Sequence, residues 1–225
     1  ASTDLLESAD GRQLVSYLVH CALPADVTLS NGDVDTCDDS EPGTYTFQGG
    51  LGLAPEWLDD GIEGLAEQKI SACLMSHVNY FGASVTISVR HPSLEVSYEE
   101  LERFPTYEGA FFGNLFDKVQ SMFVCSGEAG PQFDNVEYPD HDKSQGDRLL
   151  RRCTDRKAAG TLCDFEYVGT CTSSCRSIEN GLVSDCYGGP GKSGALYQEA
   201  ITTWLLDPTD AESIWPEAYH TYYGP

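Results

Sequence analysis

Basic side chains are scarce in this sequence. It contains 13 Lys and Arg against 36 Asp and Glu, which gives a net charge of −23. Nucleic acids and anionic membrane surfaces are themselves negatively charged and would repel such a chain. We therefore expect no nucleic-acid partner and no attachment to an anionic membrane.

Long apolar runs are also missing. One of the longest, residues 14–23, falls well short of the ~20 residues that a membrane-spanning helix needs. We therefore expect neither a membrane span nor a signal peptide in this sequence. The opening residues, ASTDLLES, are typical of a mature protein after cleavage of an export signal at small residues.

The common metal and haem motifs are absent as well. No CxxC or CxxCH occurs, and the five histidines form no HxxxH or HExxH pair, so a zinc site local in sequence is excluded. A site built from residues distant in sequence remains open. The nearest approach to a metal motif is a CxxxC at Cys171 and Cys175, one residue too long.

Cysteine itself is abundant. Nine cysteines in 225 residues without a metal motif indicate disulfides formed in an oxidising compartment, hence a secreted or cell-surface protein. We expect at least three disulfides, and four as the fullest pairing. Because nine is odd, at least one thiol is free or joins another chain. Close spacing strains a disulfide, so Cys171 and Cys175 should each pair with a distant partner. The cysteines are Cys21, Cys37, Cys73, Cys125, Cys153, Cys163, Cys171, Cys175 and Cys186.

The hydrophobic pattern predicts one α+β domain over residues 1–225. Two helices are expected near the start, at 11–23 with Asp10 as N-cap and at 59–79. A mostly antiparallel sheet should follow, then a disulfide-rich, loop-dominated C-terminal portion that includes a cysteine-rich subregion at 151–194. The expected strands are 44–48, 83–90, 109–116, 119–125 and 162–168, whereas 197–206 fits a strand or a helix.

An acidic loop near the N-terminus is the first candidate site. Alternating aspartates across a turn can direct several oxygens at a hard cation such as Ca²⁺, although the spacing departs from an EF-hand. The alternative is an acidic surface loop held by Cys37. The candidate ligands are Asp33, Asp35, Asp38 and Asp39; a second acidic loop contains Asp134, Glu137, Asp140, Asp142 and Asp147.

Catalytic motifs are few. Cys73 and His77 lie four residues apart on the second expected helix and could form a nucleophilic pair, although a structural pair on the core face is the preferred interpretation. The carboxylates Glu108 and Asp117 are further candidates. The glycine-rich segment 188–194 ends in GKS but lacks the spacing of a phosphate-binding loop, which favours a simple turn.

Three features favour self-association. Residues 1–68 hold fourteen acids and one base, whereas residues 143–192 hold eight bases and six acids, so the two regions could attract each other. At least one of the nine cysteines cannot pair within the chain. The C-terminus gathers four large rings that could dock on the parent chain or on a neighbouring subunit, namely Trp215, Tyr219, Tyr222 and Tyr223.

Several phrases resemble a known group: LVHCALP, GGLGLAPEW, ISACLMSHVNYFG and EGAFFGNLF. With the later cysteines they resemble uncharacterised secreted or lipoprotein-like bacterial proteins of the myxobacterial type, over roughly residues 15–205. The resemblance implies export and no particular chemistry, and this chain lacks an N-terminal lipidated cysteine. Two functions therefore stay open: an extracellular structural, self-assembling or binding protein, with calcium as a possible cofactor, or a secreted hydrolase whose site is assembled from distant residues.

Overall fold

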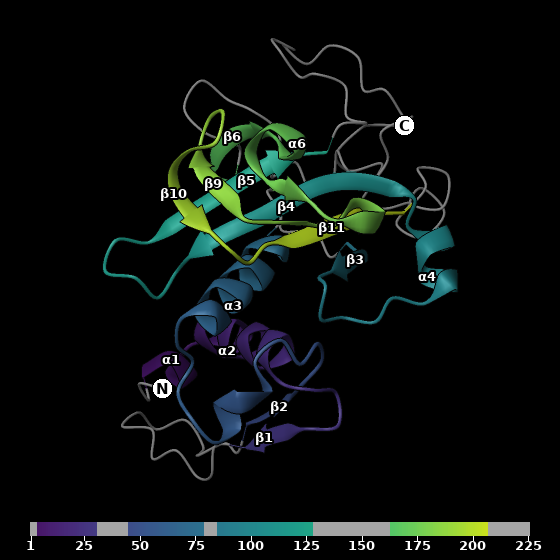
Figure 1. The fold of residues 1–225 in the computed structure, drawn as a ribbon. Helices are drawn as coiled ribbons and strands as arrows, with labels where there is room; N and C mark the ends of the chain where they lie inside the picture. The colour runs from purple at the N-terminus through teal and green to yellow at the C-terminus, as the bar shows by residue number, and fades with distance from the viewer. Residues whose placement is uncertain (1–3, 31–44, 79–84, 128–162, 207–225) are drawn as a thin grey trace, which may run out of the picture. The chain divides into compact units, whose positions relative to one another are not determined.

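The computed structural model describes residues 4–30, 45–78, 85–127 and 163–206 (Figure 1). The chain has an α+β fold and divides into two units, 1–70 and 71–225, whose boundary falls within a helix. The single domain expected from the sequence stays a prediction. Among the described residues, no helix is both long and apolar enough to cross a membrane.

The first unit contains the first of the two helices that the sequence predicts. It contains, in chain order, α1 (Asp4–Glu7), α2 (Ala9–Ala22), β1 (Thr28–Ser30), β2 (Thr46–Gln48), a 3-10 turn (Pro55–Leu58) and the start of α3 (Leu65–Ser76). The N-cap of α2 is Ser8 and not Asp10. The Oγ atom of Ser8 accepts the Gly11 N–H at 2.9 Å, and Asp10 lies inside the first turn.

Helix α3 is shorter than the 59–79 stretch expected from its apolar stripe. Gly64 adopts a φ of +60°, a left-handed conformation that cannot continue a right-handed helix. The helix therefore begins at Leu65, and it ends at Ser76.

A five-stranded sheet forms the centre of the second unit. Its strand order is β3-β11-β4-β5-β6, antiparallel throughout except between β5 and β6. Its strands are β3 (Ile87–Arg90), β4 (Thr106–Asn114), β5 (Ser121–Ser126), β6 (Glu166–Thr170) and β11 (Ile201–Leu205). The ambiguous segment 197–206 thus contributes a strand that lies between β3 and β4. Its β-branched and aromatic residues suit that position.

Short elements complete the second unit. They are α4 (Tyr98–Arg103), α6 (Cys171–Ser174), β7 (Arg176–Ser177), a 3-10 turn (Glu179–Gly181), β8 (Val183–Ser184), β9 (Cys186–Gly189) and β10 (Ser193–Tyr197). Strands β7 and β8 form one two-stranded sheet, and β9 and β10 form another. The disulfide-rich C-terminal portion predicted from the sequence is confirmed.

Strand β4 is buried on both faces from Glu108 to Asn114. On one face, Phe112 packs with β5, α6 and β9 in a cluster that includes the cysteines of this region. Figure 1 shows α6 and β9 lying over β4 and β5 on that side. On the other face, Phe111 packs with Met75, Val124 and Phe165. The sheet is therefore the central layer of the second unit.

Candidate functional site

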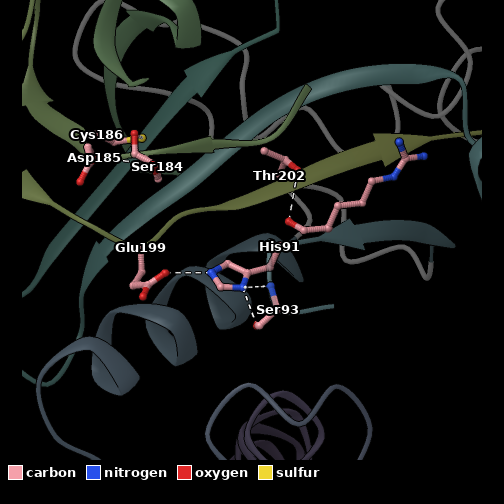
Figure 2. Close-up of polar contacts among 8 residues, drawn as sticks. His91, Ser93, Ser184, Asp185, Cys186, Glu199 and Thr202 are labelled. Carbon is pink, nitrogen blue, oxygen red and sulfur yellow. Dashed lines mark hydrogen bonds and ion pairs between the residues drawn. The ribbon is translucent and has the colours of Figure 1, made fainter. Parts of the chain in front are cut away.

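A histidine at the end of β3 is hydrogen-bonded to a glutamate 108 residues away. The Nε2 atom of His91 lies 2.8 Å from Oε2 of Glu199, and their side chains are 5% and 18% exposed (Figure 2). The antiparallel register of β3 and β11 pairs Arg90 with Thr202, which brings Glu199, two residues before β11, alongside the residues just after β3. The Thr202 hydroxyl also donates to the Arg90 carbonyl at 3.2 Å.

The second ring nitrogen of His91 faces a turn in its own segment. The backbone N–H of Ser93 donates to Nδ1 at 3.1 Å, and the Ser93 hydroxyl lies 2.7 Å from the same atom. Since Nδ1 accepts a backbone N–H, the ring proton resides on Nε2 and points at Glu199. The turn is closed by a bond from the Leu94 N–H to the His91 carbonyl at 2.9 Å.

This geometry orders a hydroxyl, an imidazole and a carboxylate in a line. Ser93 is exposed, whereas His91 is buried. The arrangement has the polarity of a Ser–His–acid relay, with the two ring nitrogens exchanged relative to the usual order. It also fixes the turn at residues 91–94 to the start of β11. The same hydrogen bonds are compatible with a catalytic role and with a structural role.

Cys73 and His77 do not form a nucleophilic pair. Cys73 is bonded in a disulfide. The Nδ1 atom of His77 lies 2.8 Å from the Cys73 carbonyl oxygen, which can only accept, so Nδ1 carries a proton and cannot act as a base. The Cys73 Sγ lies 3.9 Å from that nitrogen. The structural interpretation preferred from the sequence is confirmed.

Glu108 and Asp117 do not share a site. Glu108 is buried in β4 and accepts a hydrogen bond from the Thr203 hydroxyl at 2.7 Å. Asp117 is exposed beyond the far end of β4. Six residue-to-residue steps of strand, from 108 to 114, already separate them by roughly 20 Å. The structure therefore does not bring these two candidate carboxylates together, because Glu108 belongs to the core of the sheet and Asp117 to a turn.

The cysteines of the C-terminal portion pair as the spacing argument predicted. Cys125 bonds to Cys171, and Cys175 bonds to Cys186. The two bonds are neighbours, with the Sγ atoms of Cys125 and Cys175 3.8 Å apart. The segment 188–194 is the hairpin between β9 and β10, as a simple turn requires.

Several predicted residues lie outside the described part of the chain. They include all four calcium candidates, Asp33, Asp35, Asp38 and Asp39, the second acidic loop at 134–147, and the aromatic C-terminus. The sequence reasoning missed the His91–Glu199 contact. The turn at His91-Pro92-Ser93 could be recognised from the sequence. No sequence pattern around Glu199, however, indicates that it contacts His91.

The chain matches no protein-family model, no curated protein and no solved structure.

Proposed function

We propose that this chain is an exported, extracytoplasmic protein that acts by binding, and that its partner is a second copy of itself. Two neighbouring disulfides in the core of the second unit support export to an oxidising compartment. The resemblance to exported bacterial proteins is in keeping with this. The uneven charge of residues 1–68 and 143–192 supports a heterologous contact, which would propagate into chains or filaments.

The observation that carries the binding role is an exposed apolar turn. The 115–120 turn joins β4 to β5 and presents Phe116 and Val119, which are 44% and 83% exposed. An isolated exposed apolar residue is ordinary, but a fixed turn that presents two of them suits a contact surface.

Hydrogen bonds hold this turn in place. The Phe116 N–H donates to Oδ1 of Asn114 at 2.9 Å, and Nε2 of Gln120 donates to the Leu115 carbonyl at 3.1 Å. The Leu115 N–H donates to the Ser71 hydroxyl at 2.8 Å. An ordered turn loses little conformational entropy on binding, which favours association.

The test is the oligomeric state of the chain and of two variants. Light scattering coupled to size exclusion should show the wild type as an oligomer at high concentration. The double variant Phe116→Ser, Val119→Ser should shift the equilibrium to monomer. Tyr98→Ser is the matched control because Tyr98 on α4 is also exposed, at 75%. A wild type that stays monomeric at millimolar concentration would contradict the proposal.

The Ser93–His91–Glu199 line favours a second candidate, a secreted hydrolase acting on esters. In this mechanism Ser93 Oγ attacks the acyl carbon while its proton moves to Nδ1 of His91. The Glu199 carboxylate stabilises the imidazolium that forms, since it lies 2.8 Å from Nε2. The leaving alkoxide then takes the proton from Nδ1, and water releases the acyl group from Ser93 by the same route.

A fluorophosphonate probe distinguishes this candidate from the first. The hydrolase should be labelled at Ser93, and Ser93→Ala should abolish the label. Glu199→Gln should slow labelling by about 10²-fold or more. Ser177→Ala, at an exposed serine of β7, serves as the control. The hydrolase is ruled out if the wild type does not react with the probe, or if the label persists in Ser93→Ala. His91 would then have only a structural role, connecting its turn to Glu199.

A further inference from the structure

We propose that Cys125, Cys171, Cys175 and Cys186 form a thiol–disulfide exchange site, in which Cys125 can change partners between Cys171 and Cys175. The co-reactant is a dithiol, either a small molecule or the active site of a dithiol oxidoreductase. This inference is independent of the binding role proposed above.

One turn of helix places two cysteines beside the same sulfur. Helix α6 begins at Cys171, and Cys175 is its C-cap, with the Cys175 N–H donating to the Cys171 carbonyl at 2.8 Å. Residues four apart on a helical turn lie on one side of it. Cys125 on β5 faces that side: it is bonded to Cys171, and its Sγ lies 3.8 Å from the Sγ of Cys175. That distance is van der Waals contact between two sulfurs.

The surroundings keep the sulfurs together. All four cysteines are 2% exposed or less, and they pack with Phe112, Phe123 and Val168. Such a core holds the sulfur of a newly released thiolate near its neighbour, and diffusion into solvent does not compete with attack. Exchange proceeds when a thiolate reaches a disulfide sulfur, through displacement of the other sulfur.

The hairpin formed by β9 and β10 provides the entry point. Cys186 lies on β9, and β9 pairs only with β10 among the described strands. Strand β10 is exposed along most of its length. A two-stranded hairpin opens more easily than a five-stranded sheet. The Cys175–Cys186 bond is therefore attacked before Cys125–Cys171, which links α6 to β5 of the five-stranded sheet.

A thiolate of the dithiol attacks Cys186 Sγ, forms a mixed disulfide and releases the Cys175 thiolate. The second thiol of the dithiol, once deprotonated, attacks its own sulfur of the mixed disulfide, which frees Cys186 and leaves the co-reactant as a disulfide. The Cys175 thiolate attacks Cys125 Sγ and expels Cys171, which takes up a proton. The net result is two electrons transferred from the dithiol, a Cys125–Cys175 bond, and thiols at Cys171 and Cys186.

Limited reduction tests this in the wild-type chain. The protein is treated with one equivalent of dithiothreitol, quenched with acid, alkylated and mapped by mass spectrometry. The expected product is a disulfide-linked peptide pair containing Cys125 and Cys175, absent before reduction, with alkylated Cys171 and Cys186. If every singly reduced molecule keeps the Cys125–Cys171 bond, the proposal is wrong.

Two single variants provide an orthogonal test that needs no reductant. Cys186→Ser leaves Cys175 without its native partner and should yield both Cys125–Cys171 and Cys125–Cys175 molecules. Cys175→Ser removes the incoming thiol and should yield Cys125–Cys171 alone. Equal disulfide maps in the two variants would contradict the exchange.

Discussion

Arg90 is a charged residue with little access to water. It is 3% exposed, and its Nη2 donates to the Phe104 carbonyl while its Nε donates to the Ser88 hydroxyl, each at 2.9 Å. Its guanidinium also stacks 4.2 Å above the ring of Trp204. Burial lowers the pKa of Arg90, and the Glu100 carboxylate partly opposes this shift. The residue thus ties β3 and β11 to the segment after α4.

Replacing Arg90 should cost more stability than replacing an exposed arginine. Arg90→Ala leaves the Phe104 carbonyl without its donor, and we expect a loss of about 3 kcal/mol in the free energy of unfolding. Arg90→Lys should recover only part of this, because an ammonium cannot make both bonds and stack. Urea denaturation measures the free energy of unfolding of both variants. The control is Arg176→Ala, whose side chain is 72% exposed and should change stability by under about 0.5 kcal/mol.

His20 on α2 should make stability depend on pH. Burial lowers its pKa below the ordinary value of 6.5. Well above pH 6.5 both the folded and unfolded states are neutral at this residue. As the pH falls below 6.5, the unfolded state takes up the proton first, so stability declines until the folded-state pKa is passed. The variant His20→Gln should show a shallower decline than the wild type between pH 6.5 and 5. Identical slopes would mean that His20 does not contribute.

At the scale of elements, the close approach of β4 and β5 depends on a glycine. Gly109 pairs with Ser126, and a Cβ at this position would overlap the carbonyl oxygen of Cys125. Backbone atoms cannot move aside as the end of a flexible side chain can. This strand pair therefore fixes the place of Cys125, on which both the native disulfide and the proposed exchange depend.

Gly109→Ala should destabilise the second unit by about 1–3 kcal/mol, because it overpacks a site closed by backbone. Thermal unfolding at neutral pH measures the change. Gly61→Ala is the matched control, since a Cβ there meets nothing within 4 Å. It should be neutral or slightly stabilising, because alanine restricts the unfolded chain. An equal loss in both variants would count against the packing argument.

At the scale of the whole molecule, the cysteines predict a thiol count. Seven of the nine, all those in the described residues, are bonded in disulfides. Since seven is odd, at least one of them pairs with a cysteine outside those residues. We therefore expect one free thiol per chain in the denatured, unreduced protein, measured with a colorimetric thiol reagent. More than three free thiols would contradict an oxidised protein.

Calcium binding at the acidic N-terminal loop would change the stability of the whole molecule, so it is measured through the melting temperature. If Asp33, Asp35 and Asp38 bind Ca²⁺, a chelator should lower the melting temperature and excess Ca²⁺ should restore it, as mass action requires. Asp33→Asn with Asp35→Asn should abolish that response. A melting temperature unaffected by both reagents would identify the loop as an acidic surface, and the double variant would then be nearly silent.

Local patterns in the sequence predicted local structure well. The stripe that gave α2 and the β-branched runs that gave the strands are short-range signals, and most of the expected strands exist. The same signals did not show which face is buried. In β3 the alternation of Ile87 and Val89 indicated a strand, yet the fully buried side chains are Ser88 and Arg90. Their hydrogen bonds to Glu100 and the Phe104 carbonyl compensate the burial.

The sequence by itself determined the charge, the abundance of disulfides, the α+β class, and the exclusion of a bond between Cys171 and Cys175. Only the tertiary structure decided the partners of these cysteines and the contact of His91 with Glu199. The physical reason is distance along the chain. Composition and periodicity describe neighbours in sequence, whereas the register of β3 on β11 and the packing of α6 on β5 bring together residues that no local pattern connects.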